Sequence, residues 1–283
     1  MLLFGLAPAG WHGWIRAEMI HPTAIIHAGA QLHPTAIVGP YVVIDEHVAV
    51  GAGCRIGPHV HLTGHTTIGA GNVFHAGCVI GDAPQDLKYK DEPTRLLIGD
   101  HNVFHEHVTV HRANKETEDT VIGSRNFLMV NCHVGHNSRI TDHVIIANGA
   151  LLGGHVQVAE RVFISGNCLV HQFVRIGTLA LMQGGSAISK DLPPYTVARG
   201  DNGICGLNTV GLRRAGFTSE QRLELRRLYH ALFRGRHRLS SALQAAQREF
   251  PSAHARVLID FIAASQRGVC ADVGQQRFNE DAD

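Results

Sequence analysis

Residues 20–38 read IHPTAIIHAGAQLHPTAIV, and an aliphatic side chain recurs at every sixth position of this stretch. The same phase continues, with two interruptions, almost to residue 190. A period of six matches neither a helix, with about 3.6 residues per turn, nor a strand, with about two, so it indicates a structural repeat. The marker positions are Ile20, Ile26, Leu32, Val38, Ile44, Val50, Ile56, Leu62, Ile68, Phe74, Ile80, Ile98, Phe104, Val110, Ile122, Leu128, Val134, Ile140, Ile146, Leu152, Val158, Ile164, Val170, Ile176, Met182 and Ile188.

This repeat predicts a parallel β-helix. Three hexads would close one triangular coil, and stacked coils would place like strands side by side, about 4.8 Å apart. The residue two positions before a marker is usually small or β-branched, and the residue after it is often glycine, which we expect at tight corners. Examples are Ala24, Ala30, Val42, Cys54 and Cys78 for the first position, and Gly39, Gly51, Gly57 and Gly69 for the second.

The repeat also divides the chain. Residues 1–18 stand outside it and lack the basic start of a signal peptide, so we expect a disordered, dispensable extension before Met19. Residues 19–200 are predicted to form the β-helix, with loops at 83–97 and 111–121. Residues 201–283 are predicted to be a helical region with a flexible tail.

Composition narrows the class of protein. Charged residues make up 17% of the chain and the formal net charge is +1, so we expect no nucleic-acid partner. No apolar stretch is long enough to span a membrane as a helix. There is no CxxC pair, and a reducing, cytoplasmic setting fits the four cysteines in the small slot of the repeat, which are Cys54, Cys78, Cys132 and Cys168.

The helical region is basic. Thr218 and Gln221 have the spacing of a capping box in front of a Leu-rich segment. Residues 211–250 contain nine arginines and three glutamates. Such a surface suits an acidic partner, although an ordinary amphipathic cap with a solvated face would have the same composition.

Counting three hexads per coil places one set of markers on a single face, provided that both insertions loop out at corners. These markers are Leu62, Ile80, Val110, Val134, Leu152, Val170 and Ile188. Histidines beside them would then form a stripe under the longer loop, made of His111, His133, His136, His155 and His171. Three imidazoles could bind Zn²⁺, or one imidazole could act as a general base near neutral pH.

Several motifs resemble the UDP-N-acetylglucosamine O-acyltransferase family, whose members begin lipid A synthesis. They are Gln85-Asp86-Leu87-Lys88-Tyr89, Glu92-Pro93-Thr94-Arg95, His111-Arg112, Leu128-Met129, His133-x-x-His136, Gly154-His155, Val170-His171-Gln172-Phe173, Asp191-x-Pro193-Pro194-Tyr195 and the stretch from Gly211 to Phe217. The resemblance covers residues 19–270. It implies a left-handed β-helix, a homotrimer with sites between subunits, a 3-hydroxyacyl donor on acyl carrier protein, a UDP-sugar acceptor, and no cofactor or metal.

The resemblance also implies roles for individual residues. His136 would be the general base and the Gly154 amide would stabilise the oxyanion. Asp86 and Lys88 would close over the acceptor, while Asn208, Arg213 and Arg214 would reach the nucleotide phosphates. His133, His155 and Gln172 would position sugar and acyl groups, whereas Gln85 and His171 could be structural instead. Chain length would depend on Gly184, with Met182 and Gln183 nearby.

The chain departs from the family pattern at several positions. Asn137 stands where the family often carries aspartate beside the base, and AlaAsnLysGluThrGlu replaces a Gly/Thr-rich stretch after Arg112. Val210 replaces an acidic residue, and Ala215 a basic one. Three alternatives therefore stay open: transfer to a 3-amino sugar, a zinc enzyme resembling γ-class carbonic anhydrase, and a non-catalytic scaffold. A sister N-acyltransferase would need a separate domain before the repeat, and eighteen leading residues are too few for one.

Overall fold

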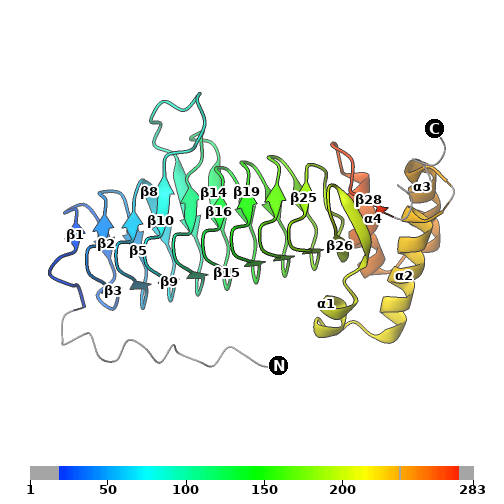
Figure 1. The fold of residues 1–283 in the computed structure, drawn as a ribbon, viewed down its shortest axis with the longest axis horizontal. Coiled ribbons are helices and arrows are strands. Elements are labelled where there is room, and N and C mark those ends of the chain that lie inside the picture. The colour runs from blue at the N-terminus through cyan, green and yellow to red at the C-terminus, as the bar shows by residue number, and fades with distance from the viewer. Residues whose placement is uncertain (1–18, 236, 274–283) are drawn as a thin grey trace.

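The chain winds into coils that stack by parallel hydrogen bonding, so that every third strand joins the same sheet (Figure 1). The computed structural model describes residues 19–235 and 237–273. The predicted extension 1–18 and residues 274–283 of the predicted tail lie outside the described residues.

Three sheets form the three faces of a prism. Face 1 consists of β1 (Ile25–Ile26), β4 (Val43–Ile44), β7 (His61–Leu62), β10 (Val79–Asp82), β13 (Thr109–His111), β16 (His133–Val134), β19 (Leu151–Leu152), β22 (Leu169–Val170) and β25 (Ala187–Ile188). Face 2 consists of β2 (Gln31–Leu32), β5 (Ala49–Val50), β8 (His65–Ile68), β11 (Arg95–Ile98), β14 (Asp119–Ile122), β17 (Arg139–Ile140), β20 (Gln157–Val158) and β23 (Arg175–Ile176). Face 3 consists of β3 (Ile37–Val38), β6 (Arg55–Ile56), β9 (Val73–Phe74), β12 (Val103–Phe104), β15 (Phe127–Leu128), β18 (Ile145–Ile146), β21 (Phe163–Ile164), β24 (Leu181–Met182), β26 (Thr196–Ala198), β27 (Gly203–Leu207) and β28 (Ala271–Asp272).

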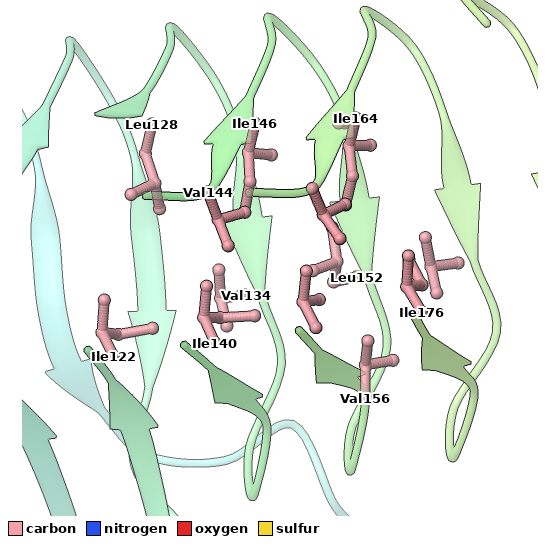
Figure 2. Packing of buried hydrophobic residues seen from close by; sticks show 14 of the residues in the cluster. Ile122, Leu128, Val134, Ile140, Val144, Ile146, Leu152, Val156, Ile164 and Ile176 are labelled. Atoms are coloured by element: carbon pink, nitrogen blue, oxygen red, sulfur yellow. The ribbon is translucent and has the colours of Figure 1, made fainter. Parts of the chain in front are cut away.

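Most strands contain two residues, of which the marker points into the coil and its predecessor points out. In β6, for example, Arg55 is exposed and Ile56 is only 1% exposed. Figure 2 shows inward side chains of successive coils packed against one another. The hexad period therefore arises because each face contributes one buried side chain per coil.

The pairing register confirms the predicted stack on face 1. Val110 pairs with Val134, Val134 with Leu152, and Leu152 with Val170. Both insertions leave at the end of a face 1 strand, as predicted, and the longer one projects from the prism (Figure 1). The loops are shorter than predicted, 83–94 and 112–118, because β11 and β14 each extend backwards to four residues along face 2.

The glycines after the markers serve a different purpose from the one predicted. The left-handed corner conformation falls three residues after the marker, at positions such as Gly53, Asn137 and His155. The glycine directly after the marker instead lies against the next coil: a Cβ on Gly51 would lie 2.6 Å from the Gly69 carbonyl oxygen. Stacking distance, rather than backbone conformation, selects glycine there.

The C-terminal part caps the last coil. β26 continues face 3, β27 pairs with it in the antiparallel direction, and β28 returns beside β27, so strands precede and follow the predicted helices. The helices are α1 (Thr209–Arg214), α2 (Ser219–Phe233), α3 (Leu239–Glu249) and α4 (Ala253–Ala263). The predicted capping box of Thr218 and Gln221 is confirmed. In the described part of the chain, no helix has the length and apolar character needed to cross a bilayer.

Replacing Ile56 by aspartate should unfold the coil, because a carboxylate would be buried without a partner. We expect the free energy of unfolding to fall by roughly 4 kcal/mol or more. Arg55→Asp, on the outward side of the same strand, should change it by less than about 1 kcal/mol. Thermal unfolding followed by circular dichroism would show the difference, and two variants of equal stability would contradict the inward assignment of Ile56.

Candidate active site

Face 1 is hollowed beside the longer loop by a cavity of about 810 Å³. Its lining includes the predicted residues His111, His133, His136, Gly154, His171 and Gln172, with Gln85 reaching it from the loop. The structure thus confirms that these histidines share one face under the loop. Gln85 and His171 are both exposed and line this cavity.

The cavity is lined by one buried imidazole, His111, and one half-buried imidazole, His133. The His111 and His133 rings meet edge to face, with centroids 4.9 Å apart. Burial, together with the neighbouring His111 and His136, lowers the pKa of His133 to about 4. Its Nδ1 lies 2.8 Å from the Thr109 hydroxyl. His133 is therefore a neutral hydrogen-bonding group near pH 7.

His136 lies at the corner that follows β16. Its Nδ1 is 2.7 Å from the Asn137 side-chain oxygen. The opposite edge of the ring faces Gly154, because a Cβ built on that glycine would lie only 2.6 Å from His136 Nε2. A side chain at position 154 would thus displace the imidazole, and Nε2 is the ring atom nearest to the added Cβ.

Gly154 offers a backbone donor at the same place. Its carbonyl accepts a hydrogen bond from the Phe173 amide at 3.0 Å, whereas its own N–H has no acceptor among the described residues. A free N–H beside an imidazole nitrogen can stabilise an oxyanion while the imidazole moves a proton. This is the geometry that the roles predicted for His136 and Gly154 require, and those roles stay predictions.

The longer loop is tied to the shorter one. Asp86 accepts hydrogen bonds from the Lys88 amide at 3.0 Å and the Asn114 side chain at 2.7 Å, and these bonds, the amide first, lower the pKa of Asp86. Arg112 donates to the Tyr89 hydroxyl and to the Gly81 carbonyl, each at 2.9 Å. Asp86 is thus held near the site, while the Lys88 side chain is exposed.

His155 lies around the corner from the main cavity. It lines a second cavity of about 690 Å³ that opens on the side of face 2. Its ring stacks on Phe173 at a centroid distance of 4.4 Å and meets the His136 ring edge to face at 5.2 Å. Burial lowers its pKa, and the neighbouring His136 adds to this. His155 therefore lines a different cavity from the other stripe histidines, although its ring still contacts His136.

The residues predicted to bind phosphates lie on another face. A third cavity, of about 550 Å³, opens on face 3 and is lined by Asn208, Val210 and Arg214. Asn208 caps α1, accepting from the Gly211 amide and donating to the Leu179 carbonyl, both at 2.9 Å. Arg213 and Arg214 are exposed and have no ion pair or side-chain hydrogen bond with another described residue. A single chain does not bring them to His136.

The chain-length role predicted for Met182 is wrong. Met182 is fully buried because it occupies the inward marker position of β24, so it packs in the coil and cannot line a groove outside it. Gln183 is half-buried and accepts a hydrogen bond from Arg199 at 2.8 Å. Gly184 is exposed at the following corner, where a Cβ would approach only the Gly166 carbonyl, at 3.5 Å.

Sequence reasoning missed residues that the loops bring to the site. Asn114 and Glu118 belong to the stretch that was recognised only as a departure from the family pattern, yet Asn114 contacts Asp86 and Glu118 contacts Asn137. Ser189 and Asn202, at the last coil, also line the main cavity. For Asn114 and Glu118, the sequence did offer one signal: the loop that contains them is polar and leaves the face that bears the histidines.

The arrangement of donor atoms bears on the zinc alternative. Among the described residues, three donors within 4.8 Å of one another are found only at His75, His105 and Glu106, on the corners that follow β9 and β12. Those two imidazoles stack in parallel at 4.4 Å. The predicted stripe contains no such converging set, which favours imidazoles acting on a substrate over a shared metal site.

Comparison with known families identifies the repeat and the cap separately. Residues 119–154 match the family model described as bacterial transferase hexapeptide (six repeats). Residues 191–270 match the model described as UDP-N-acetylglucosamine O-acyltransferase, domain 2.

Full-length relatives agree with both matches. Acyl-[acyl-carrier-protein]–UDP-N-acetylglucosamine O-acyltransferase of Thermodesulfovibrio yellowstonii is 42% identical over 254 residues, which is 89% of this chain and 98% of the relative. The enzyme of the same name from Janthinobacterium is 43% identical over 259 residues, 89% of this chain and 99% of the relative.

Solved structures show the same fold. UDP-N-acetylglucosamine acyltransferase from Francisella novicida superposes with a TM-score of 0.87 at 31% identity, covering 91% of this chain and 96% of that one. The enzyme from Moraxella catarrhalis gives 0.85 at 35% identity, covering 89% of this chain and all of that one.

Fold and site together define a hexapeptide-repeat acyltransferase built on a left-handed parallel β-helix. Within that class, the chain belongs to the acyl-[acyl-carrier-protein]–UDP-N-acetylglucosamine O-acyltransferase family. The resemblance drawn from the sequence motifs is thereby confirmed.

The depressed pKa of His133 predicts a stability that depends on pH. An unfolded histidine has a pKa of about 6.5, and the folded value is about 4. Between these two pH values the unfolded chain binds a proton at this histidine that the folded chain does not bind. The free energy of unfolding should therefore be highest above about pH 6.5 and fall as the pH is lowered toward about 4. The total decrease from this group is at most about 3 kcal/mol. His133→Gln should flatten this decline in denaturant titrations, whereas the exposed His33→Gln should not. Equal slopes in all three proteins would contradict the prediction.

Proposed function

We propose that this protein transfers a 3-hydroxyacyl chain from acyl carrier protein to the glucosamine 3-hydroxyl of UDP-N-acetylglucosamine, the first step of lipid A synthesis. The observation that carries the proposal is the pair formed by His136 Nε2 and the unengaged Gly154 amide, in a cavity lined by further histidines. Acyl transfer needs a base and an oxyanion donor at one place, and this pair supplies both.

The chemistry follows from the two groups. His136 Nε2 takes the proton of the sugar 3-hydroxyl as its oxygen attacks the thioester carbonyl. The carbonyl oxygen becomes an oxyanion that accepts a hydrogen bond from the Gly154 amide. When the tetrahedral intermediate collapses, the C–S bond breaks and the thiol leaves with the proton returned by His136. His133, held neutral by its burial, positions the substrates by hydrogen bonding without adding charge.

A homotrimer would complete the site. Asn208, Arg213 and Arg214 lie beside face 3, whereas His136 lies at the edge of face 1, and these faces diverge on one prism. Threefold association of three-sided prisms would set one chain's face against a different face of its neighbour. The free guanidiniums of one subunit could then bind the diphosphate of a sugar held by the next.

Exposed arginines on the helical cap would recruit the acidic carrier protein. They include Arg226, Arg227, Arg238 and Arg248. The open corner at Gly184 would admit a medium-to-long acyl chain.

We propose a cytoplasmic location, which suits six cysteines that are all free thiols. A 3-amino sugar is the second acceptor to test, since Asn137 places no carboxylate directly on the base and an amine needs less help from one.

His136→Ala should abolish transfer, by at least about 100-fold, because the base is lost. Purified protein would be incubated with 3-hydroxyacyl carrier proteins of several lengths and UDP-N-acetylglucosamine or its 3-amino analogue, with products measured by mass spectrometry. The exposed His33→Ala serves as the control. Product only from the amino analogue would reassign the acceptor, and unchanged turnover in His136→Ala would end the role of this base.

Mixed trimers should test whether the site is shared between subunits. His136→Ala and the double variant Arg213→Ala/Arg214→Ala should each be inactive alone. After unfolding and refolding together, about a quarter of wild-type activity should return, because each site would draw its base and its arginines from independently assorted chains. Separately refolded samples mixed afterwards are the control. A mixture that stays inactive would contradict a shared site. It would mean either that the base and the arginines act within one chain, or that the arginines lie outside the active site.

A further inference from the structure

Asn137 occupies a corner that favours its type of residue. It has a φ of 59°, in the left-handed region that asparagine tolerates better than most side chains. The residue is 6% exposed, and its amide N–H donates to the Thr120 hydroxyl at 2.7 Å. This bond fixes the backbone of the corner, and the Asn137 side-chain oxygen lies 2.7 Å from His136 Nδ1.

Two further contacts fix which end of the Asn137 amide faces the imidazole. The Asn114 backbone N–H, which can only donate, lies 3.0 Å from the Asn137 Oδ1. The Glu118 carboxylate, an acceptor when ionised, lies 2.7 Å from the Asn137 Nδ2. The oxygen must therefore face His136. Because an amide oxygen only accepts, His136 must carry its proton on Nδ1, which leaves Nε2 free beside Gly154.

We propose that Glu118 is a positioning residue for His136, acting through the side-chain amide of Asn137. The inference rests on the proposed function for its catalytic consequence. The carboxylate accepts from one end of the amide and strengthens the acceptor oxygen at the other, as happens in chains of hydrogen bonds. The relay Glu118–Asn137–His136 thus does what a carboxylate directly on the imidazole would do: it holds the ring and selects the tautomer in which Nε2 is the base.

The other neighbours of Glu118 are weaker. Its carboxylate lies 3.6 Å from His155 Nδ1 and 3.8 Å from Lys115 Nζ, both longer than its bond to Asn137. The backbone N–H of Glu118 donates to the Lys115 carbonyl, which closes the turn just before β14. The loop 112–118 is therefore shaped to present this carboxylate to the corner of the base.

Glu118→Ala should lower kcat roughly tenfold with little change in the KM for the sugar, because the tautomer and orientation of the base are affected rather than binding. Adding Asn137→Asp to Glu118→Ala should restore most of kcat, since a carboxylate then contacts His136 directly. Glu116→Ala, which removes an exposed carboxylate from the same loop, is the matched control and should leave kcat unchanged.

A spectroscopic readout separates this inference from the proposed function. Nitrogen-15 shifts of the His136 ring report whether the proton resides on Nδ1, whatever the enzyme acts on. We expect the Nδ1–H form in the wild type and in Glu118→Ala/Asn137→Asp, and a mixture of tautomers in Glu118→Ala. If the wild type transfers no acyl chain but shows this pattern, the function is wrong and the relay stands.

Three results would overturn the relay: an unchanged kcat and tautomer in Glu118→Ala, an equal loss in Glu116→Ala, or no rescue by Asn137→Asp. Glu118→Gln covers the case in which Glu118→Ala does not fold. The glutamine oxygen can still accept from Asn137 without a charge, so kcat should fall less than tenfold. A glutamine variant indistinguishable from the wild type in both kcat and tautomer would also contradict the proposal.

Discussion

The parallel register between coils is the constraint on which the rest of this protein depends. Outside the two insertions, each coil strand forms hydrogen bonds with the strand eighteen residues further on, as Val134 pairs with Leu152. A one-residue slip would turn an inward side chain outward, so the buried markers keep the whole stack in phase. The site inherits this precision, because His136 and Gly154 belong to successive coils and meet only when their strands are in register.

Periodicity could predict much of the fold and part of the site for this reason. Once three hexads make a coil, the set of markers from Leu62 to Ile188 follows by counting, and so does the sharing of a face by His111, His133 and His171. Counting also shows why Met182 cannot line an outer groove: it is itself a marker, and its side chain points into the core. The role predicted for it came from the resemblance, which carries no information on direction.

Contacts that depend on loop geometry or on corner direction could not be obtained in this way. His155 follows the same marker set, yet its corner turns it toward face 2 and onto Phe173. Asn208 was predicted as a phosphate ligand, and nothing in the sequence indicated that its side-chain oxygen caps α1 while its amide nitrogen donates to the Leu179 carbonyl. Such hydrogen bonds depend on the local backbone geometry, and the six-residue period predicts nothing about residues in loops outside the repeat. The same is true of Glu118, whose place beside Asn137 is decided by a turn within the loop.

The relay from Glu118 also has an energetic reason. An ionised carboxylate at position 137 would be buried at a corner where the whole residue is 6% exposed, and burial of a charge is costly unless it is fully paired. The neutral amide avoids that cost while keeping an acceptor oxygen against His136. The charge resides instead on Glu118, whose side chain is 40% exposed and remains partly hydrated. The base is thus oriented by a carboxylate that stays near solvent, at the expense of requiring a structured loop to deliver it.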